Sequence, residues 1–371
     1  MNITIAESRK LRAKVTFGSK WTEGFKQWPN VKWTLQIPFA RKNATNGMIF
    51  AKGCVNAMDI NTLQAIEIGN EPNFYAGPDR RRPYGPRQYA EEWKQYAGWV
   101  AGNITLPEGP MFQSMDIASG GNLSKWDVAT MFDDYGLDEG AIIRSASYHY
   151  YQTTGGKPLR STLLNHTDTE AKTNHFLPAI EYLNSTRDDS VHLIIGEAGS
   201  GLTNHRRDYN LEASLGTALW TVDWMLYCMS MNMTRVNMQL GVWFPFTAWT
   251  PIEYLGKPPH ILGSFYGNLF IADFINKVGN LRVHQFKEAI PISEREKISA
   301  YAGYHHGELS KIVILNLEFW NQTVTEIIKS KDTDKPSSSS DKTTTTKTKT
   351  LPPPAQPDSS TSPSPPALSP I

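Results

Sequence analysis

Two segments of this chain share one pattern, in which a short apolar run ends at a glycine and a glutamate follows closely. Residues 65–68 lead to Glu71 and Pro72, and residues 191–195 lead to Glu197. Such runs predict strands that are buried on both faces, as in a parallel sheet. Because Pro72 cannot donate to a strand ladder, Glu71 is predicted at the end of its strand. The first segment alone fits an ordinary strand and turn equally well, and the second one favours a site.

The spacing of the two glutamates then predicts a fold class. Glu71 and Glu197 lie roughly 125 residues apart, and a (β/α)8 barrel of about 250 residues uses about 31 residues per βα unit. The separation fits three units with some insertion, which places the two side chains across the mouth of the barrel. Paired carboxylates at such a mouth are the groups that glycoside hydrolysis requires. We therefore predict an α/β fold of the (β/α)8 type.

The rest of the chain alternates between strand-like and helix-like segments. Besides the two segments above, barrel strands are predicted at residues 32–39, 111–117, 142–151 and 236–246. Helices are predicted at residues 46–58, 88–100, 125–135, 167–186, 211–231 and 263–278. Asp223 lies inside an apolar helix, where a buried carboxylate needs a partner. Short strands at residues 280–289, 297–304 and 311–320 predict an antiparallel β-domain after the barrel.

Four motifs carry a resemblance to a known family. They are IEIGNEPN at residues 66–73, SYHYY at 147–151, IGE at 195–197 and ALWTVDW at 218–224. Together and in this order they resemble glycoside hydrolase family 79, the fungal β-glucuronidases related to heparanase, over about residues 1 to 325. The resemblance implies a (β/α)8 barrel followed by an antiparallel β-sandwich. It also implies retaining hydrolysis of β-glucuronides or glucuronate-containing glycans.

The resemblance assigns the roles in the reaction. Glu71 becomes the acid/base and Glu197 the nucleophile of a double displacement. Asn70 is placed to hold the 2-hydroxyl of the sugar, an interaction that strengthens in the transition state. We expect no metal and no other cofactor, because the chain has no Cys/His cluster with ligand spacing.

The YHYY run at the end of the predicted strand 142–151 is a second part of the expected site. Strand alternation points His149 and Tyr151 to one face, and Tyr148 and Tyr150 to the other. A lone histidine is more often a satisfied core residue, but beside three tyrosines at a strand end a role in the site is favoured. Either Tyr150 or Tyr151 is expected to donate a hydrogen bond that orients Glu197, and both tyrosines, with His149, are expected to bind substrate.

The substrate is less constrained by the residues. The family binds the uronate carboxylate partly through a Gly-Tyr step after the last strand, where this chain has Trp243 and Phe244. These two residues are nevertheless expected to contact the substrate. Three alternatives stay open: a β-glucuronidase, a related β-glycosidase on neutral sugars, and an inactive truncated homologue.

Composition and charge bear on partners and location. A net charge of +1 argues against a nucleic-acid partner, and no apolar run reaches the ~18 residues of a membrane span. Cys54 and Cys228 form either one bridge or two buried thiols, and the oligomeric state stays open. Eight N-glycosylation sequons predict a secreted, extracellular glycoprotein: Asn2, Asn43, Asn103, Asn122, Asn165, Asn184, Asn232 and Asn321.

The expected domains are a barrel over residues 1–278, a partial β-sandwich over 279–329 and a disordered tail over 330–371. Only about 62 residues precede the strand that leads to Glu71, whereas three βα units need ~94. We therefore expect the barrel to lack its first strand or two and the chain to be truncated. The tail is rich in Lys, Ser, Thr and Pro, a composition that cannot bury a core.

Deleting residues 330–371 is expected to leave the melting temperature unchanged, because this composition contributes no packed surface. The measurement is thermal unfolding of the full chain and of the shortened chain, followed by circular dichroism. A drop of several degrees in the shortened chain would show that the tail packs on the rest of the protein.

Overall fold

The computed structural model describes residues 18–40, 42–119, 125–187, 190–202, 209–241, 244–253, 256–276 and 280–319. Those up to Glu318 belong to one compact unit. The predicted tail over residues 330–371 lies outside the described residues, and the predicted division into domains stays a prediction.

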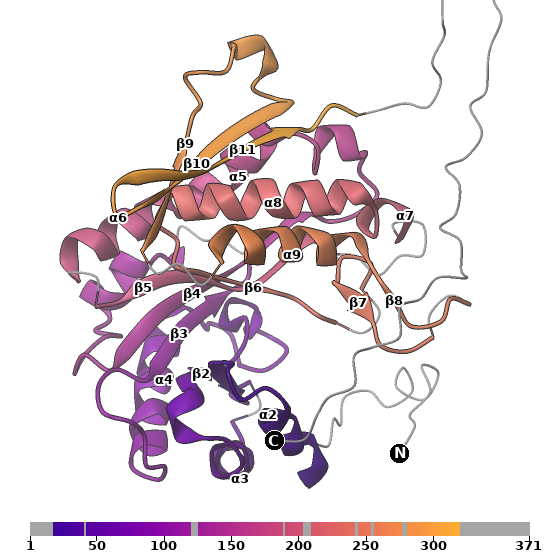
Figure 1. Cartoon of the computed structure of the whole chain (residues 1–371). Helices are drawn as coiled ribbons and strands as arrows, with labels where there is room; N and C mark the ends of the chain where they lie inside the picture. The colour runs from indigo at the N-terminus through magenta and orange to yellow at the C-terminus, as the bar shows by residue number, and fades with distance from the viewer. Residues whose placement is uncertain are drawn as a thin grey trace, which may run out of the picture. The chain divides into compact units, whose positions relative to one another are not determined.

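One parallel sheet of six strands dominates the compact unit (Figure 1). The strands follow one another in chain order from β1 to β6, and every neighbouring pair is parallel. This is the order of a (β/α)8 wall, and it confirms the predicted parallel α/β architecture over these six strands. The strands are β1 (Trp33–Ile37), β2 (Leu63–Ile68), β3 (Phe112–Ile117), β4 (Ile143–Thr153), β5 (His192–Gly201) and β6 (Arg235–Met238).

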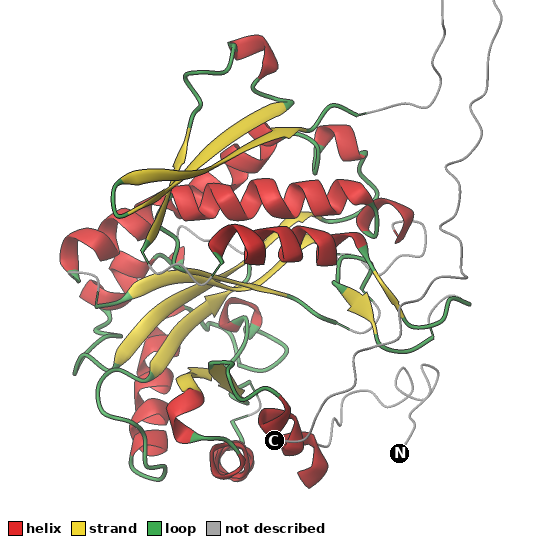
Figure 2. Ribbon diagram, in the orientation of Figure 1, coloured by secondary structure: helices red, strands yellow, loops and turns green. Residues whose placement is uncertain are grey.

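Helices fill the connections between these strands (Figure 2). In α4, Pro86 occupies the first turn, where its missing N–H costs nothing, and the predicted aromatic stripe is buried at Tyr89, Trp93 and Tyr96. The other long helices also bury apolar residues. The helices are α3 (Ala44–Ala57), α4 (Pro86–Ala101), α5 (His166–Thr173), α6 (Leu177–Thr186), α7 (Tyr209–Glu212), α8 (Leu215–Ser230) and α9 (Gly263–Ile275).

Two predicted helices are each broken in two. The helix expected over residues 167–186 becomes α5 and α6, because Pro178 fits only the first turn of a helix and therefore starts a new one. The helix expected over 211–231 becomes α7 and α8. The Ser214 hydroxyl accepts a hydrogen bond from the Gly216 N–H at 3.2 Å and caps the start of α8.

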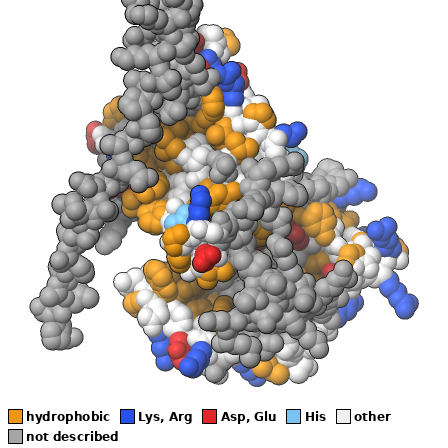
Figure 3. All heavy atoms as spheres, turned by 90° about the vertical axis from the view of Figure 1, so that its right-hand side faces the viewer, with side chains coloured by type: hydrophobic (Ala, Val, Ile, Leu, Met, Phe, Trp, Pro, Cys, Tyr) orange, Lys and Arg blue, Asp and Glu red, His pale blue; other side chains and the backbone are white. Residues whose placement is uncertain are grey.

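Two further predictions were too long. The helix expected over residues 125–135 is confined to residues 128–134, of which Thr130–Asp134 form a π-helical turn. It begins behind an Asp127 cap and ends before Gly136, where φ is 59°. Of the strand expected over residues 236–246, 236–238 belong to β6, and the described residues 239–241 and 244–246 lie outside any strand. One of the latter, Pro245, cannot donate to a ladder. A two-stranded ribbon of β7 (Trp249–Thr250) and β8 (His260–Ile261) follows, on a face with exposed apolar side chains (Figure 3).

The predicted antiparallel strands after the barrel are confirmed. They are β9 (Leu281–Gln285), β10 (Ile298–His305) and β11 (Glu308–Asn316), in the order β11-β10-β9. A two-residue turn at His306 and Gly307 joins β10 to β11, and both residues have the positive φ that such hairpins need. In the described part of the chain, the predicted β-sandwich is represented by this three-stranded sheet.

A buried polar cluster fastens this small sheet to α8. The Asp223 carboxylate accepts hydrogen bonds from the Ser299 and Tyr301 hydroxyls, at 2.6 and 2.8 Å, and lies 2.9 Å from His166 Nδ1. His166 Nε2 lies 3.3 Å from Glu170. The prediction that the buried carboxylate of Asp223 has partners is therefore confirmed: His166 comes from α5, and Ser299 and Tyr301 come from β10.

Cys54 and Cys228 are both buried and free, so the alternative of two thiols holds over that of a bridge. Within the described part of the chain, no helix has the length and apolar character needed to span a membrane.

The Asp223 cluster makes stability depend on pH. Burial lowers the pKa of His166, but the hydrogen bond and charge of Asp223, with those of Glu170, more than offset this and raise it from 6.5 to about 9. A raised pKa gives stability that is complete below pH 6.5 and is lost as the pH rises through 9.

We expect the unfolding free energy to fall by on the order of 3 kcal/mol between pH 6.5 and pH 9.5, and His166→Gln to remove most of this dependence. Urea denaturation at both pH values measures it. His175→Gln, at an exposed histidine, serves as the control and should keep the wild-type dependence. An equal fall in wild type and His166→Gln would show that other groups cause it.

Candidate active site

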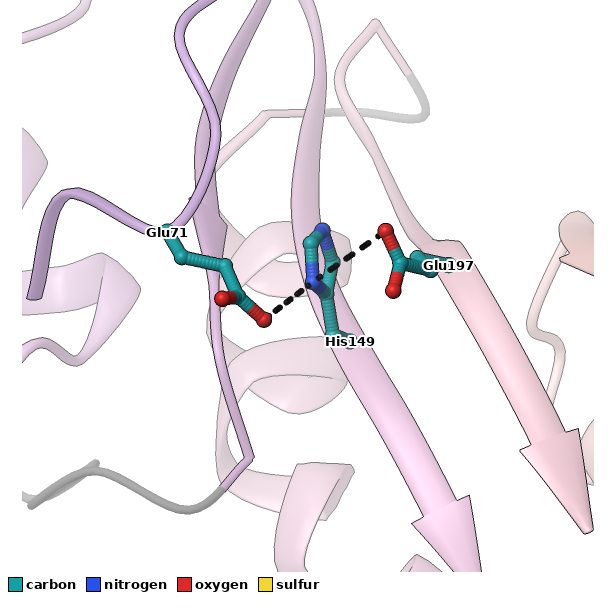
Figure 4. Close-up of side chains that lie close together, drawn as sticks. All are labelled: Glu71, His149 and Glu197. Atoms are coloured by element: carbon teal, nitrogen blue, oxygen red, sulfur yellow. Dashed lines mark hydrogen bonds and ion pairs between the residues drawn. The ribbon is translucent and has the colours of Figure 1, made fainter. Parts of the chain in front are cut away.

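The two predicted glutamates and the predicted histidine come from three strands of the parallel sheet. Glu71 follows the end of β2, His149 lies on β4 and Glu197 lies on β5 (Figure 4). In parallel strands, side chains near the carboxyl ends share one edge of the sheet. Glu71 has a left-handed backbone, with φ at 50°, and its N–H donates to the Asp116 carbonyl at 3.0 Å. This bond holds the turn after β2 against the end of β3.

The two carboxylates flank the histidine ring. His149 Nδ1 lies 3.1 Å from Glu71 Oε1 and 4.0 Å from Glu197 Oε2. The His149 side chain is only 2% exposed, whereas those of Glu71 and Glu197 are 29% and 24% exposed. The carboxylates therefore face solvent, and the imidazole packs behind them.

One oxygen of Glu71, one oxygen of Glu197 and one ring nitrogen of His149 all lie within 4.8 Å of one another. A small cation fits such a spacing, but exposed acidic groups also cluster without one. Two carboxylates at this separation, both open to solvent, also suit an acid/base and a nucleophile acting on one bond.

Of Tyr150 and Tyr151, it is Tyr151 that contacts a carboxylate of the site. Its hydroxyl donates a hydrogen bond to Glu197 Oε1. Burial and then the Glu197 carboxylate raise the pKa of Tyr151, so the phenol keeps its proton and remains a donor. The Phe246 ring meets the Tyr151 ring edge-on at 5.6 Å, and Phe244 stacks on Phe246 at 4.9 Å. Phe244 is thus connected to Tyr151 through Phe246, and the three rings form an aromatic wall.

Tyr150 does not join the site. It points to the other face of β4, where it stacks on Trp224 of α8 at 4.9 Å and donates a hydrogen bond to Gln152. The prediction that Tyr150 binds substrate is therefore wrong, because strand alternation sends it toward the helices. Trp243 lies outside the described residues.

Asn70 borders the site from the β1 side. Its Oδ1 accepts a hydrogen bond from Gln36 at 3.2 Å, and its backbone N–H donates to the Tyr75 hydroxyl at 3.2 Å. It lines a cavity of about 440 Å³ together with Gln36, Glu71 and Phe74. Space for a bound molecule therefore continues from Glu71 toward β1.

Sequence reasoning missed a buried acidic pair beneath the site. The Gln113 amide donates to Glu67 at 2.6 Å and to Asp116 at 3.1 Å. Burial, then the Asp116 charge, raises the pKa of Glu67 well above its ordinary value, and burial raises that of Asp116 to about 7. A charged residue inside the apolar run 65–68 was the signal that could have revealed the pair.

Two curated relatives match the chain in sequence, and both are named β-glucuronidase. One, from Aspergillus niger, is 26% identical over 337 residues and covers 87% of this chain and 61% of the relative. The other, from Neurospora crassa, is 27% identical over 288 residues and covers 71% and 50%. The chain therefore spans between half and two thirds of the length of these relatives. No family model matches.

Solved structures share the fold. A 4-O-α-L-rhamnosyl-β-D-glucuronidase from Fusarium oxysporum has a TM-score of 0.68 at 16% identity, over 87% of this chain and 66% of that one. An α-L-arabinofuranosidase from Thermotoga maritima has a TM-score of 0.54 at 13% identity, over 83% and 65%. The six-stranded sheet with its helices accordingly fits a (β/α)8-like glycoside hydrolase fold.

Close packing around Tyr151 gives a test of this geometry. A Cβ added at Gly199 would lie 2.9 Å from the Tyr151 ring and 2.8 Å from the Phe246 ring. We expect Gly199→Ala to lower the unfolding free energy by about 1–3 kcal/mol, because both rings must shift.

The matched control is Gly53→Ala, in the interior of α3, where an added Cβ meets nothing within 4 Å. It should raise stability by up to about 1 kcal/mol. Urea denaturation of both variants makes the comparison. A Gly199→Ala protein as stable as wild type would mean that the aromatic wall is not packed against β5.

Proposed function

We propose that this protein is a retaining glycoside hydrolase that cleaves β-glucuronides. The observation that carries the proposal is the spacing of Glu71 and Glu197, whose nearest carboxylate oxygens lie within 4.8 Å. Retaining glycosidases place their two carboxyl groups about 5–5.5 Å apart, and inverting ones about 6.5–9.5 Å apart. The shorter separation leaves no room for a water between carboxylate and sugar, so one carboxylate attacks the sugar directly.

In the first step, the Glu197 carboxylate attacks the anomeric carbon while the glycosidic C–O bond breaks. Glu71 gives its proton to the departing oxygen. In the second step, the ionised Glu71 takes a proton from water, the water oxygen bonds to the anomeric carbon, and Glu197 leaves as a free carboxylate. Each proton that Glu71 gives up is thus returned within one turnover.

Neighbouring side chains support these two roles. The Tyr151 hydroxyl donates to Glu197 and fixes one carboxylate oxygen, which leaves the other directed at the sugar. His149 lies 3.1 Å from Glu71 and packs behind it. Asn70, next to Glu71, lines the cavity in which the sugar hydroxyls would lie. These contacts set the orientation that a displacement requires.

The glucuronide substrate rests on the names of the two curated relatives and on the sequence resemblance. The second candidate is a β-glycosidase for neutral sugars. Phe244, which stands where the family has a tyrosine, offers no hydroxyl to a carboxylate. The Arg80 side chain is buried and already pairs with Glu92 at 2.9 Å. Comparing 4-nitrophenyl β-glucuronide with 4-nitrophenyl β-glucoside separates the two candidates.

The proposal extends to location. Four sequon asparagines, Asn43, Asn103, Asn184 and Asn232, are exposed in the described chain, so an oligosaccharide could be attached without disturbing the core. This supports secretion as a glycoprotein. Release of glycans by an endoglycosidase from protein expressed in a secreting eukaryotic host would test it.

We expect Glu197→Gln to abolish turnover of 4-nitrophenyl β-glucuronide, because an amide cannot form the glycosyl-enzyme. Glu71→Ala should reduce the rate by about 10²–10⁴-fold on poor leaving groups. On 4-nitrophenyl β-glucuronide, whose leaving group needs no proton, azide added to Glu71→Ala should speed the second step and yield a β-glycosyl azide. Glu91→Gln, at an exposed glutamate on α4, is the control and should match wild type. Unchanged turnover in Glu197→Gln would remove this residue from the mechanism.

A further inference from the structure

Asp116 sits where strand β3 leaves regular geometry. Its φ is 47° and that of Met115 is 79°, and the pairing register between β3 and β4 shifts between Met115 and Ile117. Left-handed backbone costs free energy in residues other than glycine and persists only where the surroundings enforce it. Irregularities of this kind redirect a side chain and are common beside active sites. Here the carboxyl of Asp116 is directed beneath the carboxylate pair.

The side chain of Asp116 lies against the back of His149. Its Oδ1 is 3.9 Å from His149 Nε2, on the opposite side of the ring from Glu71, and it accepts the Gln113 amide at 3.1 Å. Asp116 is 1% exposed, and its Oδ2 has no hydrogen-bond partner among the described residues. A Cβ on Gly196 would lie 2.8 Å from Oδ1, so a glycine on β5 makes room for this carboxyl.

The backbone of the same residue holds Glu71. The Glu71 N–H donates to the Asp116 carbonyl at 3.0 Å. Just beyond, Asn73 and Ala118 exchange two hydrogen bonds, at 3.2 and 3.1 Å. The turn that carries Glu71 is thereby fastened to the end of β3 at three points. Asp116 therefore contacts Glu71 through its main chain and, through its carboxyl, the imidazole that lies 3.1 Å from Glu71.

We propose that Asp116 is a positioning residue for the acid/base: its carboxyl fixes the His149 ring from behind, and the ring in turn fixes the Glu71 carboxyl. The inference rests on the proposed function, since it assigns Asp116 to the proton-transfer half of that reaction. Loss of the Asp116 side chain then mainly impairs protonation of the leaving oxygen, while attack by Glu197 is largely retained.

The test compares two leaving groups. Methyl β-glucuronide needs a proton from the enzyme as its alkoxide departs, whereas 4-nitrophenolate leaves readily without one. Asp116→Ala should lower kcat/KM on the methyl glycoside by about 10²-fold, the effect of a displaced catalytic group. On the 4-nitrophenyl glycoside the loss should be only a few-fold. Asp116→Asn, which keeps the shape behind His149, should retain most of the activity on both.

The matched control is Ser114→Ala, also on β3, fully buried and with an unpartnered hydroxyl in the described structure. It should leave both rates unchanged. If Asp116→Ala does not fold, the same two rates are measured on Asp116→Ser. Equal losses on the two substrates, no loss on either, or Asp116→Asn behaving like Asp116→Ala would each overturn the proposal.

A readout without turnover keeps the two proposals distinguishable. In protein labelled with ¹⁵N-histidine, the His149 ring signals are assigned by their disappearance in His149→Ala. They should move in Asp116→Ala and stay in place in Ser114→Ala. If wild type cleaves no glucuronide, the proposed function fails, and this spectrum alone decides whether Asp116 fixes the ring. Unmoved His149 signals in Asp116→Ala would overturn the positioning role.

Discussion

The parallel order of the sheet is the constraint on which the site depends. Glu71, His149 and Glu197 lie far apart in the sequence, and they meet because β2, β4 and β5 end at one edge. An antiparallel neighbour would carry its side chain to the opposite edge. The turn after β2 adds the left-handed backbone that aims Glu71 back over the sheet. The site residues are thus brought together because the strands that carry them run in the same direction.

Below this edge, the protein interior contains buried polar and charged side chains, whereas protein interiors are usually apolar. The Gln113 amide donates to both Glu67 and Asp116 under His149. Beside α8, the Asp223 carboxylate contacts His166, Ser299 and Tyr301. Buried carboxyls are costly unless their oxygens are satisfied, so each cluster fixes a particular arrangement of the elements that supply the partners. One cluster supports the site, and the other joins the small sheet to the barrel wall.

The aromatic wall of Tyr151, Phe246 and Phe244 packs against one side of the proposed sugar site. Tyr151 is held by Phe246, and Phe244 stacks behind it, so the donor to Glu197 is braced by packing. Gly199 leaves space for both rings. Such support limits the motion of the carboxylate during a displacement, which needs near-attack geometry. The rings of this wall carry no positive charge that could pair with a uronate carboxylate.

The sequence by itself determined the strand order, the glutamate that follows β2, the glutamate on β5 and the face of β4 that carries His149 and Tyr151. These follow from local patterns: apolar runs, a proline that stops a strand, and alternation along a strand. Only the tertiary structure decided that Tyr150 stacks on Trp224 and that β6 ends at Met238. It alone placed Asp116 behind His149, because a register shift between strands has no signature in either strand's own residues.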